Sequence, residues 1–144
     1  MTDALPFDAA LRRHRHARAA PGFGAVAFLH DLMAEELRER VGLVARPFAD
    51  VLDLGGPRRC WPGATRVALS ASEPDAIVAD EDALPFADAR FDLVVSAGAL
   101  TTVNDLPAAL AGIRRVLRPD GLFVAAFVGG MSLVELRACL LEAE

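Results

Sequence analysis

The stretch VLDLGGPRR, Val51 to Arg59, decides the fold. Its first four residues, Val51 to Leu54, form a short apolar run that is typical of a buried strand, and two glycines, Gly55 and Gly56, follow directly. A strand that ends in glycines is typical of the first turn of an open parallel sheet, because backbone N–H groups there approach a ligand closely. Asp53 is expected to lie under the turn as a hydrogen-bond acceptor.

Strands and helices alternate through the rest of the chain. Phe91 to Ala97 (FDLVVSA) is a β-rich run of the kind found in sheets covered on both faces, and Leu122 to Val128 is a second one. Between them, Asn104 or Asp105 is predicted to cap a helix. This order predicts an α/β fold with a Rossmann-like parallel sheet, helices on both faces and right-handed crossovers.

Two helices are predicted before the first strand. The segment from Asp8 to Ala20 is polar nearly all round, and Pro21 ends it. From Gly24 onward, apolar residues recur at three- and four-residue spacing, which predicts one apolar helix stripe covered by the sheet. The members of this stripe are Val26, Leu29, Met33, Leu37 and Val41. His30 is predicted to lie on the helix surface.

Length and composition limit the classes of protein. The 144 residues predict a single domain, with a helical region over 1–46 and a Rossmann-like core over 47–144. The net charge of -5 argues against nucleic acid as a partner, and no uncharged stretch is long enough to span a bilayer. Neither cysteine belongs to a metal-ligand pattern. These features predict a cytoplasmic protein without a metal site or membrane contact.

Three segments together resemble, in order, the motifs of class I S-adenosylmethionine-dependent methyltransferases of the type 11 kind. They are VLDLGG, then ADEDALPFADARFDLVVS (Ala79 to Ser96), then LTTVNDLPAALAGIRRVLRPDGLFVAAF (Leu100 to Phe127). The N-terminal region resembles the branch related to respiratory complex I assembly factors, and a second similar group is the biotin-pathway methyltransferases. The resemblance implies a methyl transfer enzyme or its degenerate descendant; the alternative is a non-catalytic assembly factor or protein-binding module on the same fold.

The resemblance also implies a site for S-adenosylmethionine. The first motif would lie beside the methionine part of the cofactor, an acidic pair would face adenine, and the strand that ends at Ser96 would face the methyl group. The acidic pair is Asp80 with Glu81 or Asp82, although a solvated loop is an alternative for this run. The implied cofactor-binding residues are therefore Asp53, Gly55, Gly56, Asp80, Glu81 and Ser96. No catalytic residue is predicted.

Several positions depart from the family's pattern. The family has glycine at the positions of Pro57 and Arg59, where proline removes an N–H donor and a long arginine side chain can occupy ligand space. Ser70 stands where a carboxylate should hold the ribose, and Glu73 is its nearest substitute. These changes predict weak or lost cofactor binding.

The connections between predicted strands are short. Parallel strands usually need a crossover of about a dozen or more residues, yet only PRRCWPGAT and then ASEPD separate the first three strands. The sheet is therefore predicted to be reduced on its cofactor-binding side. The sequence ends in a segment that resembles the helix before the family's last strands, so either those strands are absent or the chain is a fragment of a longer one. An exposed sheet edge of this kind favours a homodimer or a protein partner.

Overall fold

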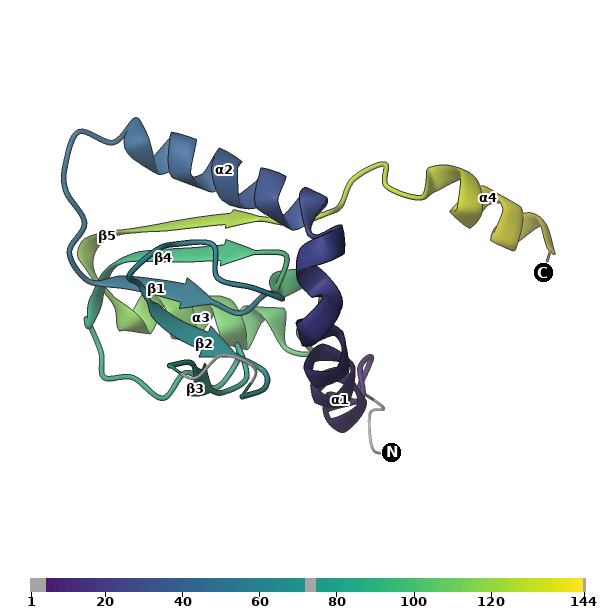
Figure 1. The fold of residues 1–144 in the computed structure, drawn as a ribbon, viewed down its shortest axis with the longest axis horizontal. Coiled ribbons are helices and arrows are strands. Elements are labelled where there is room, and N and C mark those ends of the chain that lie inside the picture. The colour runs from purple at the N-terminus through teal and green to yellow at the C-terminus, as the bar shows by residue number, and fades with distance from the viewer. Residues whose placement is uncertain (1–4, 72–74, 144) are drawn as a thin grey trace.

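The computed structural model describes residues 5–71 and 75–143. Its strands form one parallel sheet in the order β3-β2-β1-β4-β5 (Figure 1). The strands are β1 (Val51–Leu54), β2 (Thr65–Ala68), β3 (Ile77–Val78), β4 (Phe91–Ala97) and β5 (Leu117–Ala126). The strand order reverses between β1 and β4. The predicted α/β fold with a parallel sheet is confirmed.

The helical segments are α1 (Ala9–Ala19), η1 (Ala20–Val26), α2 (Phe28–Gly42), η2 (Leu100–Thr102), α3 (Leu106–Val116) and α4 (Val134–Ala143). Two of these helices begin at an aspartate whose side chain caps the first turn. The Asp8 carboxylate accepts a hydrogen bond from Leu11 N at 2.9 Å and caps α1. Asp105, one of the two predicted caps, accepts from Ala108 N at 2.8 Å and begins α3.

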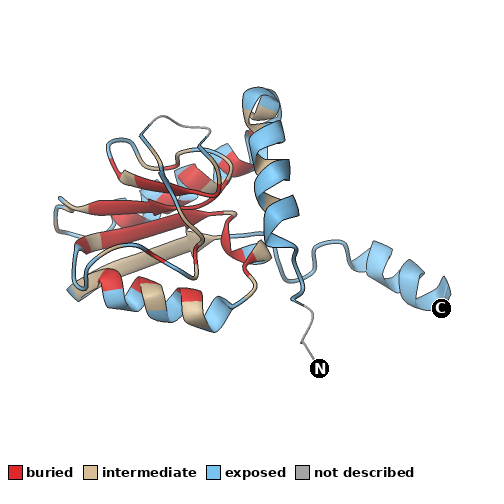
Figure 2. Cartoon of the chain, turned by 90° about the horizontal axis from the view of Figure 1, so that it is seen from below, coloured by how far each residue is buried: buried red, intermediate tan, exposed pale blue. Residues whose placement is uncertain are grey.

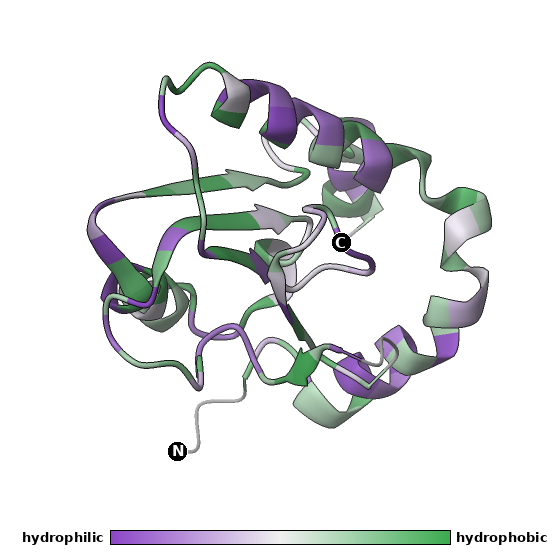
Figure 3. Cartoon of the chain, turned by 60° about the vertical axis from the view of Figure 1, so that its left-hand side comes forward, coloured by the Kyte–Doolittle hydropathy of each residue, from purple (hydrophilic) through white to green (hydrophobic). Residues whose placement is uncertain are grey.

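The two faces of the sheet carry separate apolar clusters. One cluster joins α2 to the sheet, with Leu37 packed among residues of β1 and β4, and the other joins α3 to it through Ile113. Buried positions concentrate on the central strands in Figure 2, and the strands are largely apolar in Figure 3. Helices therefore cover both faces, as predicted.

The buried stripe of α2 differs from the predicted one. Its buried side chains are His30, Ala34, Leu37 and Val41. The predicted members Val26 and Leu29 are exposed, because residues 20–26 form a 3-10 helix and α2 packs on the sheet through the small Ala34. The prediction that His30 lies on the helix surface is wrong.

The short connections leave one side of the sheet with fewer covering helices. The loop 55–64 joins β1 to β2, and 69–76 joins β2 to β3, without a helix among the described residues of either. Leu52 still pairs with Thr65, and Val67 with Ile77, in parallel register. In the first loop, Trp61 packs against the cluster that α2 covers. The predicted reduction of this side is confirmed, with a folded loop in place of a crossover helix.

Two helices contribute little to the core. Helix α1 stands across the carboxyl ends of the strands, and α4 projects away from the sheet in both Figure 1 and Figure 2. Neither contains a buried residue. Within 5–71 and 75–143, no helix combines the length and apolar character that crossing a membrane requires.

Candidate cofactor site

The glycine turn at the end of β1 is closed over by neighbouring side chains. Gly55 and Gly56 have φ angles of 66° and 80°, in the left-handed region that favours glycine. A Cβ atom on Gly55 would lie 2.6 Å from the Ala99 Cβ and 2.8 Å from Oε1 of Glu81. Both glycines are buried, so the backbone of the turn faces protein atoms.

Asp53 lies under this turn as an acceptor, as the sequence predicts. Its buried carboxylate accepts hydrogen bonds from the backbone N–H groups of Cys60 at 2.6 Å and Trp61 at 3.0 Å. Burial and the adjacent Asp53 charge raise the pKa of the Cys60 thiol far above its usual range, so this thiol stays neutral. Asp53 therefore anchors the loop that replaces the missing crossover helix.

A buried arginine on β2 holds the turn from within the protein. Arg66 donates to Asp53 Oδ1 at 2.9 Å, to Gly56 O at 3.0 Å and to Gly55 O. In the sequence, this arginine stands out only because it lies next to a short apolar run. The structure places it directly opposite Asp53 in the pairing of β1 with β2. Arg59, which sequence reasoning expected to intrude, instead donates to Ala64 O within its own loop.

The acidic pair after β3 is bound by arginines of α1. Arg12 Nη2 lies 2.7 Å from both carboxylate oxygens of Glu81, which is fully buried, and Arg12 Nε donates to Thr102 Oγ1 at 3.1 Å. Arg13 forms a second ion pair with Asp80. The structure therefore brings Glu81 against the glycine turn and leaves Asp80 farther out, each with a cationic partner.

Further contacts hold α1 in place across the strand ends. Asn104 bonds with the backbone of Phe7 twice, as acceptor and as donor, both at 2.9 Å. His16, on α1 itself, is half-buried, and burial followed by the charges of Arg12 and Arg66 lowers its pKa. His14, on the same helix, is exposed.

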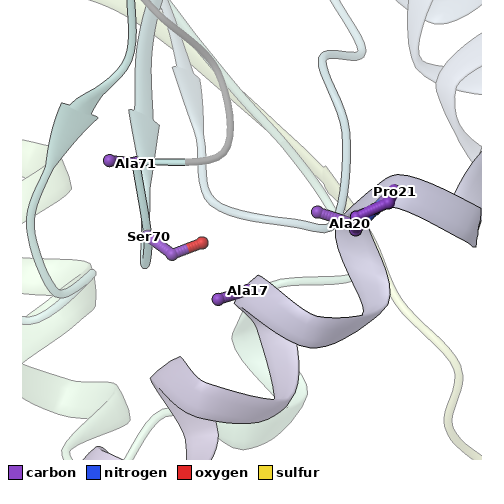
Figure 4. Close-up of a pocket in the computed structure, with 5 residues that line it drawn as sticks. All are labelled: Ala17, Ala20, Pro21, Ser70 and Ala71. Atoms are coloured by element: carbon purple, nitrogen blue, oxygen red, sulfur yellow. The ribbon is translucent and has the colours of Figure 1, made fainter.

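The remaining predicted positions lie apart from the glycine turn or inside the sheet. Ser96 is buried, and its hydroxyl donates to Leu54 O at 2.9 Å, across the pairing of β1 with β4. Ser70 lines a hollow of about 440 Å³ together with Ala71 and three residues of α1 and η1 (Figure 4). Glu73, its expected substitute, lies outside the described residues.

A second hollow lies on the other side of the glycine turn. It has a volume of about 340 Å³ and lies between the start of α2 and the segments that follow β1, β4 and β5. His30 and Pro57 line it. Neither this hollow nor the one at Ser70 is lined by Asp53 or Glu81.

A parallel sheet in the order 3-2-1-4-5, with a glycine turn at its switch point, defines a Rossmann-like fold. Comparison with known proteins agrees. Residues 60–125 match the family described as "Methyltransferase domain". Arginine-hydroxylase NDUFAF5 from Mus musculus is 37% identical over 163 aligned residues, which cover 96% of this chain and 46% of the relative. Malonyl-[acyl-carrier protein] O-methyltransferase from Methylovorus is 32% identical, over 94% of this chain and 56% of the relative.

Solved structures show the same fold. A Thermotoga maritima S-adenosylmethionine-dependent methyltransferase superposes with a TM-score of 0.61 at 15% identity, over 91% of this chain and 69% of that one. A Burkholderia thailandensis 1,6-didemethyltoxoflavin-N1-methyltransferase, solved with S-adenosylhomocysteine, superposes with a TM-score of 0.61 at 24% identity. The match covers 86% of this chain and 66% of that one.

The resemblance to S-adenosylmethionine-dependent methyltransferases seen in the sequence is confirmed, with the family match over residues 60–125. The chain spans about half the length of the curated relatives that it matches. The alignment of 163 residues also exceeds the 144 residues of this chain, so the relative contains residues without a counterpart here.

Proposed function

We propose that this chain is a methyltransferase-like protein with an eroded cofactor pocket, which binds S-adenosylmethionine weakly. The family uses this cofactor, and a neighbour of the same fold was solved with its demethylated product. The observation that carries the proposal is that both members of the acidic pair are bound by arginines. Glu81 is paired with Arg12 and Asp80 with Arg13.

The serine at position 70 and the arginine bound to Glu81 should each weaken the binding of the cofactor. A hydrogen bond to a charged group contributes roughly 1.5 to 3 kcal/mol net. Loss of the ribose carboxylate at Ser70 and of the glutamate acceptor at Glu81 removes two such bonds. Together they lower the affinity by about 3 to 5 kcal/mol, or roughly two to four decades in Kd.

Calorimetric titration with S-adenosylmethionine and S-adenosylhomocysteine tests this proposal. We expect no binding in the low micromolar range and a Kd near the millimolar range for both compounds. In ligand-detected NMR at millimolar cofactor, Arg12→Ala, which removes the cation bound to Glu81, should tighten the residual binding. Asp88→Asn, which changes a carboxylate paired with Arg115 on the surface, should leave it unchanged. A low micromolar Kd would contradict the proposed erosion.

A second candidate function is a protein-binding module that uses the sheet edge at β5. Among the described strands, β5 pairs only with β4, and most of its residues are half-exposed. A neighbour in the solved structures, with a TM-score of 0.60 at 20% identity over 78% of this chain and 59% of that one, is a complex between the Haloferax volcanii Trm112 methyltransferase activator and a methyltransferase.

Sedimentation velocity on the purified chain tests this second candidate. A dimer that dissociates on dilution would support an interface at the sheet edge. Gly98 N donates to Ala126 O, so alternate residues of β5 face β4 and the backbone of Ala125 faces the open edge. Ala125→Pro removes a donor from that edge and should shift the chain toward monomer. A chain that stays monomeric up to millimolar concentration would argue against self-association through β5.

A further inference from the structure

The apolar hollow beside the glycine turn is built from four parts of the chain that are distant in sequence. The start of α2 and the preceding 3-10 segment form one wall, and the segments after β1, β4 and β5 form the other. Its lining is dominated by large apolar side chains. They include Phe23, Leu29, Met33, Pro57 and Val128. A hollow of about 340 Å³ falls in the size range of small-molecule sites, which are mostly apolar with a few polar groups.

His30 is the polar side chain that distinguishes this hollow. It is 3% exposed, and neither of its ring nitrogens has a hydrogen-bond partner among the described residues. The nearest carboxylate oxygen, Oδ1 of Asp31, lies 3.7 Å from Nδ1, which is too long for a hydrogen bond. Thr101, the other polar side chain in the lining, already donates to Gly98 O.

A buried imidazole with two unused nitrogens is costly, because an unsatisfied buried polar group costs about 1 to 3 kcal/mol. The ring is held by apolar contact, with Phe23 edge-on at a centroid distance of 6.0 Å. A half-turn of the ring about its Cβ–Cγ bond exchanges nitrogen and carbon positions. Both nitrogens are buried as the ring stands, and no hydrogen bond in the described structure opposes the turn that would bring one of them toward the hollow.

We propose that this hollow binds a small neutral aromatic molecule bearing one hydroxyl or ring N–H group, which forms a hydrogen bond with His30. Aromatic and aliphatic side chains supply the shape and apolar contact, and a charged ligand would lose too much hydration there. Burial lowers the pKa of His30, so its neutral ring offers one donor and one acceptor near neutral pH. The inference goes beyond the proposed function, because it requires no cofactor.

Phenol and toluene are suitable probes, since they have similar size and differ mainly in the hydroxyl group. In NMR titrations of the unmodified chain without cofactor, we expect phenol to bind at least tenfold more tightly than toluene. Phenol should also shift the imidazole ¹⁵N resonances of His30, and toluene should not. Equal affinity for the two probes, or unchanged imidazole resonances with phenol, would overturn the proposal.

Variants locate the binding and identify the polar group. Leu29→Trp fills the rim of this hollow, whereas Leu32→Trp, also exposed on α2, lines a different hollow and is its control. We expect phenol binding to be lost only in Leu29→Trp. His30→Leu should remove the preference for phenol over toluene while the helix content seen by circular dichroism is kept. Phenol binding that survives Leu29→Trp would show that the ligand binds elsewhere and would refute the site.

Discussion

Arg66 and Asp53 form an ion pair of 2.9 Å within the sheet, where both side chains are fully buried. The two residues lie opposite each other on β2 and β1. The same guanidinium bonds with the carbonyl oxygens of Gly55 and Gly56. This pair therefore connects β1, the glycine turn and β2.

Removal of Arg66 should be strongly destabilising. Arg66→Met leaves the Asp53 carboxylate buried without its cation, which typically costs about 3 to 5 kcal/mol. We expect this loss in the free energy of unfolding measured in urea, with partial recovery in the double variant Arg66→Met/Asp53→Asn. Arg40→Met is the control, because the exposed Arg40–Glu36 pair contributes less than about 1 kcal/mol. Similar losses in the two single variants would contradict this role.

The two adjacent arginines of α1 should differ in their effect on the helix. Arg12 pairs with the buried Glu81, whereas the Arg13–Asp80 pair is largely exposed. We expect Arg12→Ala to lower the free energy of unfolding by about 1 to 3 kcal/mol and to speed amide hydrogen exchange across residues 9–19. Arg13→Ala should cost less than about 1 kcal/mol. Equal exchange rates in the two variants would show that Glu81 does not hold α1.

The glycine turn should not tolerate a side chain. Gly55→Ala combines a φ of 66° with a Cβ position 2.6 Å from the Ala99 Cβ, so we expect a loss of at least about 2 kcal/mol and a lower Tm. Gly42→Ala is the matched control at the end of α2, where no atom lies within 4 Å of the new Cβ. It should be neutral or stabilise by up to about 1 kcal/mol. A tolerated Gly55→Ala would mean that the turn is open.

Stability should depend on pH through His30. Burial, the largest cause, and Arg66 lower its pKa in the folded chain, while Asp31 and Asp53 act in the opposite direction. The unfolded chain then binds more protons, so the free energy of unfolding falls as the pH falls below about 6.5 toward the lowered pKa. His30→Leu should flatten this decline in urea titrations between pH 8 and pH 5.

A control is needed for the second histidine with a lowered pKa. His16 lies on α1, where burial and the charges of Arg12 and Arg66 lower its pKa, and it contributes a decline of the same sign. His16→Asn should therefore remove only part of the pH dependence and leave the rest to His30. If His30→Leu left the pH profile unchanged, the imidazole would not be held in its neutral form by burial.

Parts of this fold follow directly from local sequence. Apolar runs bounded by turn residues place β1 and β4 at their observed positions, because strands of a parallel sheet are covered on both faces and so consist largely of apolar side chains. The short linker after Gly56 excludes a full crossover helix. Asp53 is predictable as an acceptor because a carboxylate at the end of a buried strand must find local donors.

Other features depend on neighbours that the sequence does not specify. Periodicity predicts that α2 has a buried stripe, but the close approach through Ala34 decides that His30 belongs to it. The partners Arg12 and Glu81 are 69 positions apart, and no local pattern pairs them. Burial of Arg66 likewise follows from the turn that it bonds with and from the carboxylate opposite it.

The sequence alone thus determined a parallel α/β sheet that is reduced around β2, since strand pattern and linker length are local properties of the chain, whereas the methyltransferase type followed from the resemblance of its motifs. Only the tertiary structure decided how the glycine turn and the acidic pair are satisfied, with Arg66 bonded inside the turn and Arg12 and Arg13 on the carboxylates. The physical reason is that a buried charge must be compensated by whichever group the fold brings near it, and that group is set by packing rather than by position along the chain.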